Sequence, residues 1–289
     1  MSPPIRFDPP TPLQYFAALV ADDASFSQLE AAIAVAQDEY PGLDPQAVLA
    51  EIDALADKLR RRLPADAAKL QRLRLLNQYF FQELGFGGNV NDYYDRRNSY
   101  LPDVLRTRRG IPITLALLYV ELAEQIGQEA RGVSFPGHFL VKLHLPRGEV
   151  IIDPFTGHSL SREQLDERLA PYRQQRGLVG EFEAPLGLFL QSAPPREVIA
   201  RLLRNLKEIH RSAHDWPRLL AVLDRLVVLQ PDDWAERRDR GLVHAQLGSL
   251  DDAADDVAAY LEHTPAAEDG ASLRRRLQGW RRRGRPLLH

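Results

Sequence analysis

The chain has 289 residues, enough for one large domain or two modest ones. Hydrophobic residues make up 44% and charged residues 27%, as in ordinary globular proteins, and the net charge of -3 gives no general attraction to nucleic acid or acidic membranes. The absence of cysteine excludes disulfides, thiolate metal sites and thiol nucleophiles. No segment has a run of apolar residues near the length of about 18 that a membrane-spanning helix needs. The N-terminus lacks the basic and then apolar pattern of a signal peptide. We therefore expect a cytoplasmic protein without membrane contact.

Three helices are predicted in the first part of the chain, after a proline-rich lead-in over residues 1–13. Apolar residues recur at helical spacing over residues 25–40, before a Pro-Gly pair. A second helix over residues 44–64 begins at Asp-Pro, because aspartate can cap and proline is pre-set for the first turn. A third helix over residues 70–84 is followed by Gly85, which favours a C-cap.

Residues 85–100 differ in character from these helices. Three glycines, three asparagines and three tyrosines predict an irregular loop with many hydrogen-bonding groups. In one interpretation the loop lines a cleft and binds a peptide or small polar ligand, with Asn91, Tyr93 and Asn98 as candidate contacts. In the other, its side chains satisfy one another in a turn network that holds the helices to a sheet.

The middle of the chain changes from helical to strand periodicity. Residues 113–126 are apolar nearly all round, as in a buried helix. Residues 132–135 predict a short strand, residues 138–145 alternate like a half-buried strand, and residues 149–153 form the return strand after a turn. A capping box at residues 161–164 then opens a further helix. The pattern predicts a small antiparallel sheet after a buried helix.

The last third of the chain is helical and repetitive. We place a linker rich in glycine and proline at residues 174–195, and helices from residue 196 onward. Pro231 and Pro265 are 34 residues apart, which is the tetratricopeptide period. Each proline should end the second helix of a helix-turn-helix unit, because proline cannot continue the hydrogen-bond ladder.

The match to that repeat is partial. Gly241 and Ala253 fall where the repeat needs small residues between its helices. Lys207 replaces the small residue of the first unit, and three polar residues fall at positions that are usually apolar: Arg237, Arg240 and His244. Two repeats leave apolar ends uncovered, so we expect residues 196–202, the C-terminal helix or the first domain to complete them.

Three short motifs mark the start of the buried helix and the strands after it. They read Arg109-Gly110-Ile111-Pro112, Pro136-Gly137-His138-Phe139 and Ile151-Ile152-Asp153-Pro154-Phe155. A helix start, a histidine and then an aspartate is the order of the Cys-His-Asp core of transglutaminase-like and papain-like enzymes. The cysteine is missing from this order.

Residues 77–169 resemble the transglutaminase-like core of a bacterial family often labelled SirB-type. Two loop motifs add to the resemblance: Asn89-Val90-Asn91-Asp92-Tyr93-Tyr94-Asp95 and Arg97-Asn98-Ser99-Tyr100-Leu101. The resemblance implies an α+β fold with a helical N-terminal layer, a degenerate transglutaminase-like (papain-like) core with a small antiparallel sheet, and C-terminal all-α tetratricopeptide-like repeats. We expect the lead-in and core over residues 1–173, the linker over 174–195 and the repeats over 196–289.

The resemblance places Pro112 where active relatives have the nucleophilic cysteine. Proline is favoured at the first position of a helix, but it has no nucleophilic atom to replace the thiol. His138 and Asp153 are then either a vestigial dyad that satisfies a buried polar pair, or a base with its orienting carboxylate for another nucleophile. Thr114 is a weak candidate for that nucleophile, and Ser134 is another. We expect the dyad on neighbouring antiparallel strands, within hydrogen-bond reach and facing the helix start.

These features favour a non-catalytic protein that binds a protein or peptide through a degenerate cleft and helical repeats, a function that would suit a regulator. The alternative is a hydrolase or acyltransferase that uses the His-Asp pair with a non-cysteine nucleophile. No cofactor or metal is predicted, because the spacing of His138, His144 and His158 does not let them chelate one ion. The arginines of residues 274–285 are the only strongly basic feature and the only candidate contact with nucleic acid.

Overall fold

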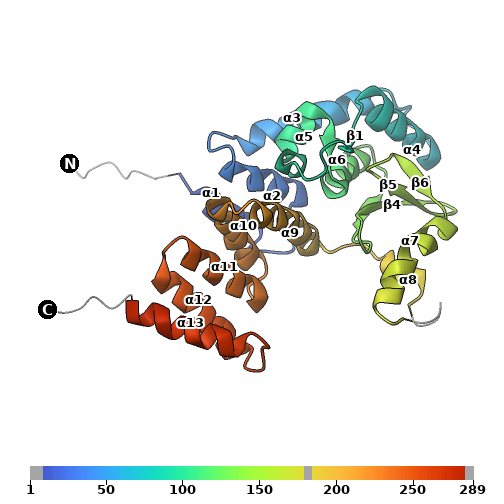
Figure 1. Ribbon diagram of the computed structural model, residues 1–289. Coiled ribbons are helices and arrows are strands. Elements are labelled where there is room, and N and C mark those ends of the chain that lie inside the picture. Colours follow the sequence, from blue (N-terminus) through green and yellow to red (C-terminus); the bar gives the residue numbers. More distant parts are fainter. Residues whose placement is uncertain (1–8, 179–183, 284–289) are drawn as a thin grey trace, which may run out of the picture. The chain divides into compact units, whose positions relative to one another are not determined.

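The structure, a computed structural model, describes residues 9–178 and 184–283 (Figure 1). By its internal contacts the chain divides into two compact units. Residues 27–202 form one unit, and the segment before residue 27 joins the segment from residue 203 onward in the other. This division differs from the predicted one, which grouped the N-terminal segment with the transglutaminase-like core.

Helices form the first half of the 27–202 unit. In chain order they are α2 (Gln28–Ala34), η1 (Val35–Asp38), α3 (Pro45–Arg60), α4 (Lys69–Asn77), the π-helical η2 (Gln78–Glu83), η3 (Arg96–Ser99), α5 (Leu101–Thr107) and α6 (Pro112–Gln125). The side chain of Asp44 caps α3, as its sequence predicts. Nearly all of α6 is buried, and it contacts α2, α3, α4 and α5, so it is the central helix of this unit.

Four antiparallel strands follow, in the order β3-β4-β5-β6. They are β3 (Ala130–Val133), β4 (Leu140–Leu145), β5 (Gly148–Asp153) and β6 (His158–Leu160). β4 and β5 pair from Val141↔Ile152 to Leu145↔Gly148, which confirms the predicted hairpin. β6 was not predicted, because its three residues carry too little alternation to be recognised.

A separate, parallel pair of short strands lies before α6. It joins β1 (Gly87–Gly88) to β2 (Arg109–Gly110). The amide of Asn89 continues this pairing by donating to the carbonyl of Gly110 at 3.2 Å. The loop that follows β1 is therefore fixed to the residues that lead into α6.

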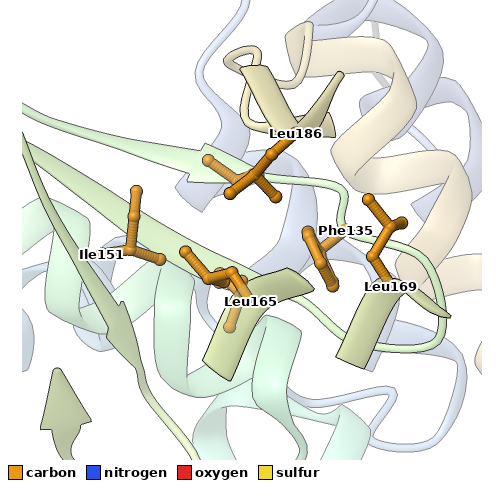
Figure 2. Packing of buried hydrophobic residues seen from close by; sticks show 7 residues of the cluster. Phe135, Ile151, Leu165, Leu169 and Leu186 are labelled. Carbon is orange, nitrogen blue, oxygen red and sulfur yellow. The ribbon is translucent and has the colours of Figure 1, made fainter. Parts of the chain in front are cut away.

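The sheet is packed on both faces, because successive strand residues point to opposite sides. α6 contacts β3 and β4, while α7 (Arg162–Gln175) and α8 (Leu186–Phe189) lie on the other side (Figure 1). Figure 2 shows side chains from the sheet, the loop after β3, α7 and α8 gathered into one cluster: Phe135, Ile151, Leu165, Leu169 and Leu186. Burying each leucine there contributes about 1.5–3 kcal/mol to stability.

Part of the segment expected to be a linker belongs to this cluster. Leu186 is buried, and Phe189 and Leu190 pack against the cluster as well. Glycine and proline nearby concealed these apolar residues in the sequence pattern. Residues 186–190 thus complete the core of the 27–202 unit instead of spanning open space.

The other unit contains the helical repeats. Its helices are the C-terminal part of α9 (Pro195–Ser212), then α10 (Trp216–Leu229), α11 (Trp234–Gln246), α12 (Leu250–His263) and α13 (Gly270–Arg283). Pro231 follows the end of α10, and Pro265 follows the end of α12, which confirms the predicted repeat phase. None of the helices that the structure describes is long and apolar enough to cross a membrane.

Small residues bring α11 and α12 together, as the sequence predicts. A Cβ added at Gly241 would lie 3.2 Å from the carbonyl oxygen of Ala253 and 3.0 Å from the Val257 side chain. Ala253 itself is fully buried. A bulkier side chain at either position would have to push the two helices apart.

Both ends of the repeat array are covered by additional helices. At one end, α1 (Pro12–Leu19) contacts α10 and buries Phe16 beneath the guanidinium of Arg225. At the other end, Leu273 and Trp280 of α13 pack against α12. The C-terminal helix was among the expected caps, whereas α1 was not predicted, and its first two residues fall in the proline-rich lead-in over residues 1–13.

Two of the polar residues at repeat positions that are usually small or apolar form ion pairs. Lys207 donates to both Glu236 and Asp239 at 2.6 Å, and so joins α9 to α11. Arg240 binds both carboxylate oxygens of Asp256 at 2.7 Å and reaches Asp224 at 3.1 Å. Each of these two cations thus meets a carboxylate from a neighbouring helix, which offsets the cost of removing the charges from water.

Candidate functional site

His138 and Asp153 form the pair that the sequence predicts. The Nε2 atom of His138 lies 2.8 Å from Oδ1 of Asp153. Asp153 is the last residue of β5, but His138 lies two residues before β4 and not within it. The turn at Pro136-Gly137, closed by the amide of His138 donating to the Phe135 carbonyl, delays the start of strand pairing until Leu140.

Asp153 is held as an anion by three partners. Its Oδ1 also accepts from the amide of Phe155 at 3.0 Å, and its Oδ2 accepts from Nη1 of Arg168 on α7 at 3.1 Å. Burial alone raises the pKa of Asp153, but its bonds to His138, Phe155 and Arg168 outweigh burial and lower the pKa to about 2. The carboxylate is therefore charged at neutral pH and fixes the imidazole ring.

This pairing leaves the Nδ1 atom of His138 without a protein partner among the described residues. His138 is partly exposed, with 24% of its side-chain surface open to solvent. An imidazole oriented through Nε2 can accept a proton at Nδ1 when a nucleophile lies within about 3 Å. The base half of a nucleophilic site is thus present.

The nucleophile of such a site is absent at position 112, where the Cys-His-Asp order of transglutaminase-like enzymes places it. Pro112 is the first residue of α6 and is buried, so position 112 offers no reactive atom. The hydroxyl of Thr114 is fully buried, accepts from the amide of Ile111 at 3.2 Å, and lies 2.8 Å from the carbonyl oxygen of Asn98. These bonds make Thr114 a cap for the start of α6 and argue against its candidacy as a nucleophile.

The hydroxyl of Ser134 is also bonded to a residue other than the histidine. Its Oγ accepts a hydrogen bond from Nη1 of Arg201 at 2.7 Å. Within the described part of the chain, no hydroxyl forms a hydrogen bond with His138. Neither of the two candidate hydroxyls is activated by the dyad.

The loop before α5 contains the turn network that one interpretation predicts, and it also exposes two of the candidate ligand contacts. Asn98 is buried, accepts from Nδ2 of Asn89 at 3.0 Å and donates to the carbonyl of Asp92 at 2.7 Å, so it belongs to a turn network. Asn91 is exposed and has no hydrogen bond to the described residues. Tyr93 is 44% exposed, and its ring centroid lies 5.9 Å from that of Phe155.

Phe155 connects the dyad to the loop and to the residues before α6. Its ring centroid lies 6.4 Å from that of His138, and its carbonyl accepts from the amide of Gly88 at 2.9 Å. Gly88 in turn pairs with Gly110. The predicted link between the dyad and the start of α6 therefore runs through an aromatic residue whose role the sequence did not indicate.

Two arginines complete the site and were missed in the sequence. Arg168 holds the second oxygen of Asp153, and Arg201 donates from Nη1 to Ser134 Oγ and to the Phe135 carbonyl at 3.1 Å. Arg168 lies on α7 and Arg201 on α9, outside the sequence motifs, so no local pattern marks them. No group of three or more His, Asp or Glu residues in the described ranges could hold a metal ion.

A pocket of about 600 Å³ lies apart from the dyad, where the sheet edge meets α7 and α8. Glu149 of β5, Ser161 before α7 and Leu186 of α8 are among its lining residues. It contains none of the residues that the sequence nominated. The site built around His138 is thus not this pocket.

Comparison with known protein families supports both the transglutaminase-like segment and the repeat segment of the chain. Residues 46–204 match the transglutaminase-like superfamily, and residues 206–278 match the tetratricopeptide repeat. Over 251 residues, 86% of the chain and 88% of the relative, 37% of positions are identical to a UPF0162 protein of Xylella fastidiosa strain 9a5c. The chain belongs to the UPF0162 family. No solved structure matches it.

Other relatives carry the same family name. A UPF0162 protein of Pseudomonas aeruginosa is 32% identical over 218 residues, 75% of the chain and 77% of that protein. UPF0162 protein YchA of Escherichia coli K12 is 29% identical over 232 residues, 78% of the chain and 81% of that protein. The predicted order of a transglutaminase-like segment followed by tetratricopeptide repeats is confirmed, whereas these relatives carry the UPF0162 name and not the SirB-type label.

Proposed function

We propose that the chain is a cytoplasmic pseudoenzyme that binds a protein or peptide and carries out no covalent chemistry on it. The observation that carries this proposal is Pro112, buried at the helix start where the transglutaminase-like order requires a nucleophile. The hydroxyls of Thr114 and Ser134 are bonded elsewhere and supply no replacement. A preserved His138–Asp153 pair is compatible with a structural role, because it satisfies a buried carboxylate.

The repeat segment supports the same proposal from a second direction. Tetratricopeptide arrays present extended surfaces that bind proteins and peptides. Here the array is capped by α1 and α13, so its apolar ends are covered. Such a capped array is suited to a partner-binding role.

The alternative is a hydrolase or acyltransferase with a non-cysteine nucleophile. One observation favours it: His138 is oriented by Asp153 and keeps Nδ1 without a protein partner in the described residues. A nucleophile brought by a substrate could use that nitrogen as a base. The His138–Asp153 pair would then act as the base for hydrolysis or acyl transfer, although the chain itself supplies no nucleophile.

Contact with nucleic acid through the C-terminal arginines has less support. Trp280 is the aromatic residue nearest those arginines in the sequence, but it is buried against α12, with Arg276 over its ring at 5.4 Å. It is therefore not free to stack on a base. Arg285 of the predicted basic tail lies outside the described residues.

The experiment uses the purified full-length chain in two assays. Fluorogenic amide and ester substrates measure turnover, and an array of random 12-residue peptides measures binding. Peptide binding without turnover is the expected result. Turnover by the unaltered chain that disappears in His138→Ala would establish the enzymatic alternative, and an array without bound peptides would contradict the binding proposal.

A further inference from the structure

Arg201 is a partly buried cation on α9 with an unusual set of partners. Nη1 uses both of its hydrogens, one on Ser134 Oγ at 2.7 Å and one on the Phe135 carbonyl at 3.1 Å. The guanidinium carbon lies 5.7 Å from the centre of the Phe139 ring. These contacts fix the plane of the guanidinium, because two hydrogen bonds and one aromatic ring hold it.

No carboxylate neutralises this cation within the described residues. Three other arginines of this site and of α9 are paired: Arg168 with Asp153, Arg204 with Asp233 and Glu236, and Arg211 with Glu208. Burial lowers the pKa of Arg201, and the Tyr93 hydroxyl acts in the opposite direction. Arginine nonetheless stays protonated at neutral pH, so a positive charge without a counter-charge remains at this position.

The free edge of the guanidinium has a defined shape. With Nη1 occupied, Nε and Nη2 donate to no acceptor in the described part of the chain. These two nitrogens present parallel N–H groups, which match the two oxygens of one carboxylate. A single guanidinium balances the charge of a monoanion, whereas a phosphate dianion would be left half neutralised.

An exposed tyrosine lies near this charge, and a second tyrosine contacts the first. Tyr93 interacts electrostatically with Arg201 and contacts the rings of both Tyr94 and Phe155. Tyr94 is 79% exposed, so its ring is open to a ligand. Tyrosines next to an arginine are the residue types that most often anchor a bound peptide.

We propose that Arg201 and the Tyr93–Tyr94 pair form a recognition site for a carboxylate of a bound peptide. This inference rests on the proposed function and names the chemistry of its ligand. The carboxylate belongs either to a peptide C-terminus or to an aspartate or glutamate side chain. Arg201 clamps it through the Nε–Nη2 edge, while the tyrosine rings cover the adjoining apolar part of the peptide.

Small probes test the carboxylate directly, and they require no altered residue in the site. The Nε–Hε signal of Arg201, assigned from its loss in Arg201→Gln, is followed by NMR in the full-length chain. N-acetylglycine should shift this signal in a saturable way, whereas N-acetylglycinamide and inorganic phosphate should leave it in place. Equal shifts with the acid and the amide, or no shift with either, would overturn the proposal.

Peptides then distinguish the two sources of the carboxylate. One set has free C-termini and no acidic residue, and the other has amidated C-termini and one aspartate or glutamate. The set that binds should lose at least tenfold in affinity with Arg201→Gln and retain more of it with Arg201→Lys. Arg211→Gln, which removes the same charge from an exposed site on the same helix, should have no effect.

These arms separate the failure of this inference from the failure of the proposed function. If amidated peptides without acidic residues bind as tightly as the others, the chain binds peptides and the carboxylate site does not exist. If no peptide binds, the proposed function fails, and the N-acetylglycine titration still decides whether Arg201 recognises a carboxylate. A melting curve of Arg201→Gln shows whether any loss of affinity comes from unfolding.

Discussion

The ring of Phe155 occupies the space where a side chain at Gly88 would lie. A Cβ added at Gly88 would come within 2.3 Å of that ring, although the Gly88 amide donates to the Phe155 carbonyl at 2.9 Å. Only glycine allows both contacts. Because Phe155 also packs near His138 and Tyr93, this single contact fixes the dyad relative to the loop.

Gly88→Ala should therefore displace Phe155 and destabilise the protein by about 1–3 kcal/mol through overpacking. Chemical denaturation of the full-length chain measures this change. Gly87→Ala is the matched control, because its Cβ would meet only the Phe155 carbonyl at 3.9 Å, an ordinary contact. Equal stability of the two variants would show that Phe155 does not depend on the glycine.

Asp153 should make stability depend on acid pH. Its pKa falls to about 2 in the folded chain, whereas an unfolded aspartate titrates near 3.9. A lowered folded-state pKa stabilises the folded state fully above the unfolded value, and this contribution is lost as the pH falls from about 4 to about 2. Asp153→Asn should flatten the pH profile of stability in this window.

The same variant should lower stability at pH 7 by about 3 kcal/mol, because Arg168 and His138 lose their buried partner. Denaturant titrations between pH 2 and pH 7 measure both effects. Asp57→Asn provides the control, since Asp57 forms an exposed pair with Arg60 and such pairs contribute about 0–1 kcal/mol. A pH profile identical to that of the unaltered chain would mean that Asp153 is not the titrating group.

Much of the fold could be predicted from local patterns. The hairpin and the two prolines of the repeats follow from alternation and from the loss of the proline amide, and the structure contains both. The role of α1 could not be predicted in this way. Its single fully buried residue, Phe16, finds its partner Arg225 more than 200 positions along the chain, and short-range periodicity carries no information about such a contact.

The candidate site could also be predicted only where its residues lie within local sequence motifs. The motif order located His138 and Asp153, because each lies beside a recognisable turn or strand. Arg168 and Arg201 reach the site from helices of ordinary composition, so their roles emerge only when the chain is folded. The hydroxyl of Thr114 likewise bonds to the carbonyl of Asn98, sixteen residues away, and this contact forms only when the chain is folded.

Restoring the missing nucleophile should not by itself restore catalysis. Pro112→Cys would place a thiol at the first position of α6, yet the residue is buried and the proline also fixes the backbone there. Acyl transfer requires aligned oxyanion donors as well as a nucleophile and base. Turnover of amide and ester substrates by Pro112→Cys should therefore stay at the background rate, with Pro112→Ala, which offers no nucleophile, as its control. Rapid turnover by the cysteine variant that is lost with His138→Ala would show that the remaining machinery is intact.

The crossing of α11 and α12 offers a test of the repeat unit. Ala253 is fully buried, and its carbonyl lies 3.2 Å from a Cβ placed at Gly241, so no space remains for a long side chain. Ala253→Arg would force a charge into this contact and should cost about 3 kcal/mol or more through overpacking and burial of an unpaired charge. Ala258→Arg on the same helix is the matched control, because Ala258 is partly exposed and the arginine can reach water there. Thermal melts of the full-length variants should show a lower transition for Ala253→Arg alone. Unchanged melting of that variant would mean that α11 and α12 do not pack through Gly241 and Ala253, and the repeat array could not then present a rigid surface to a partner.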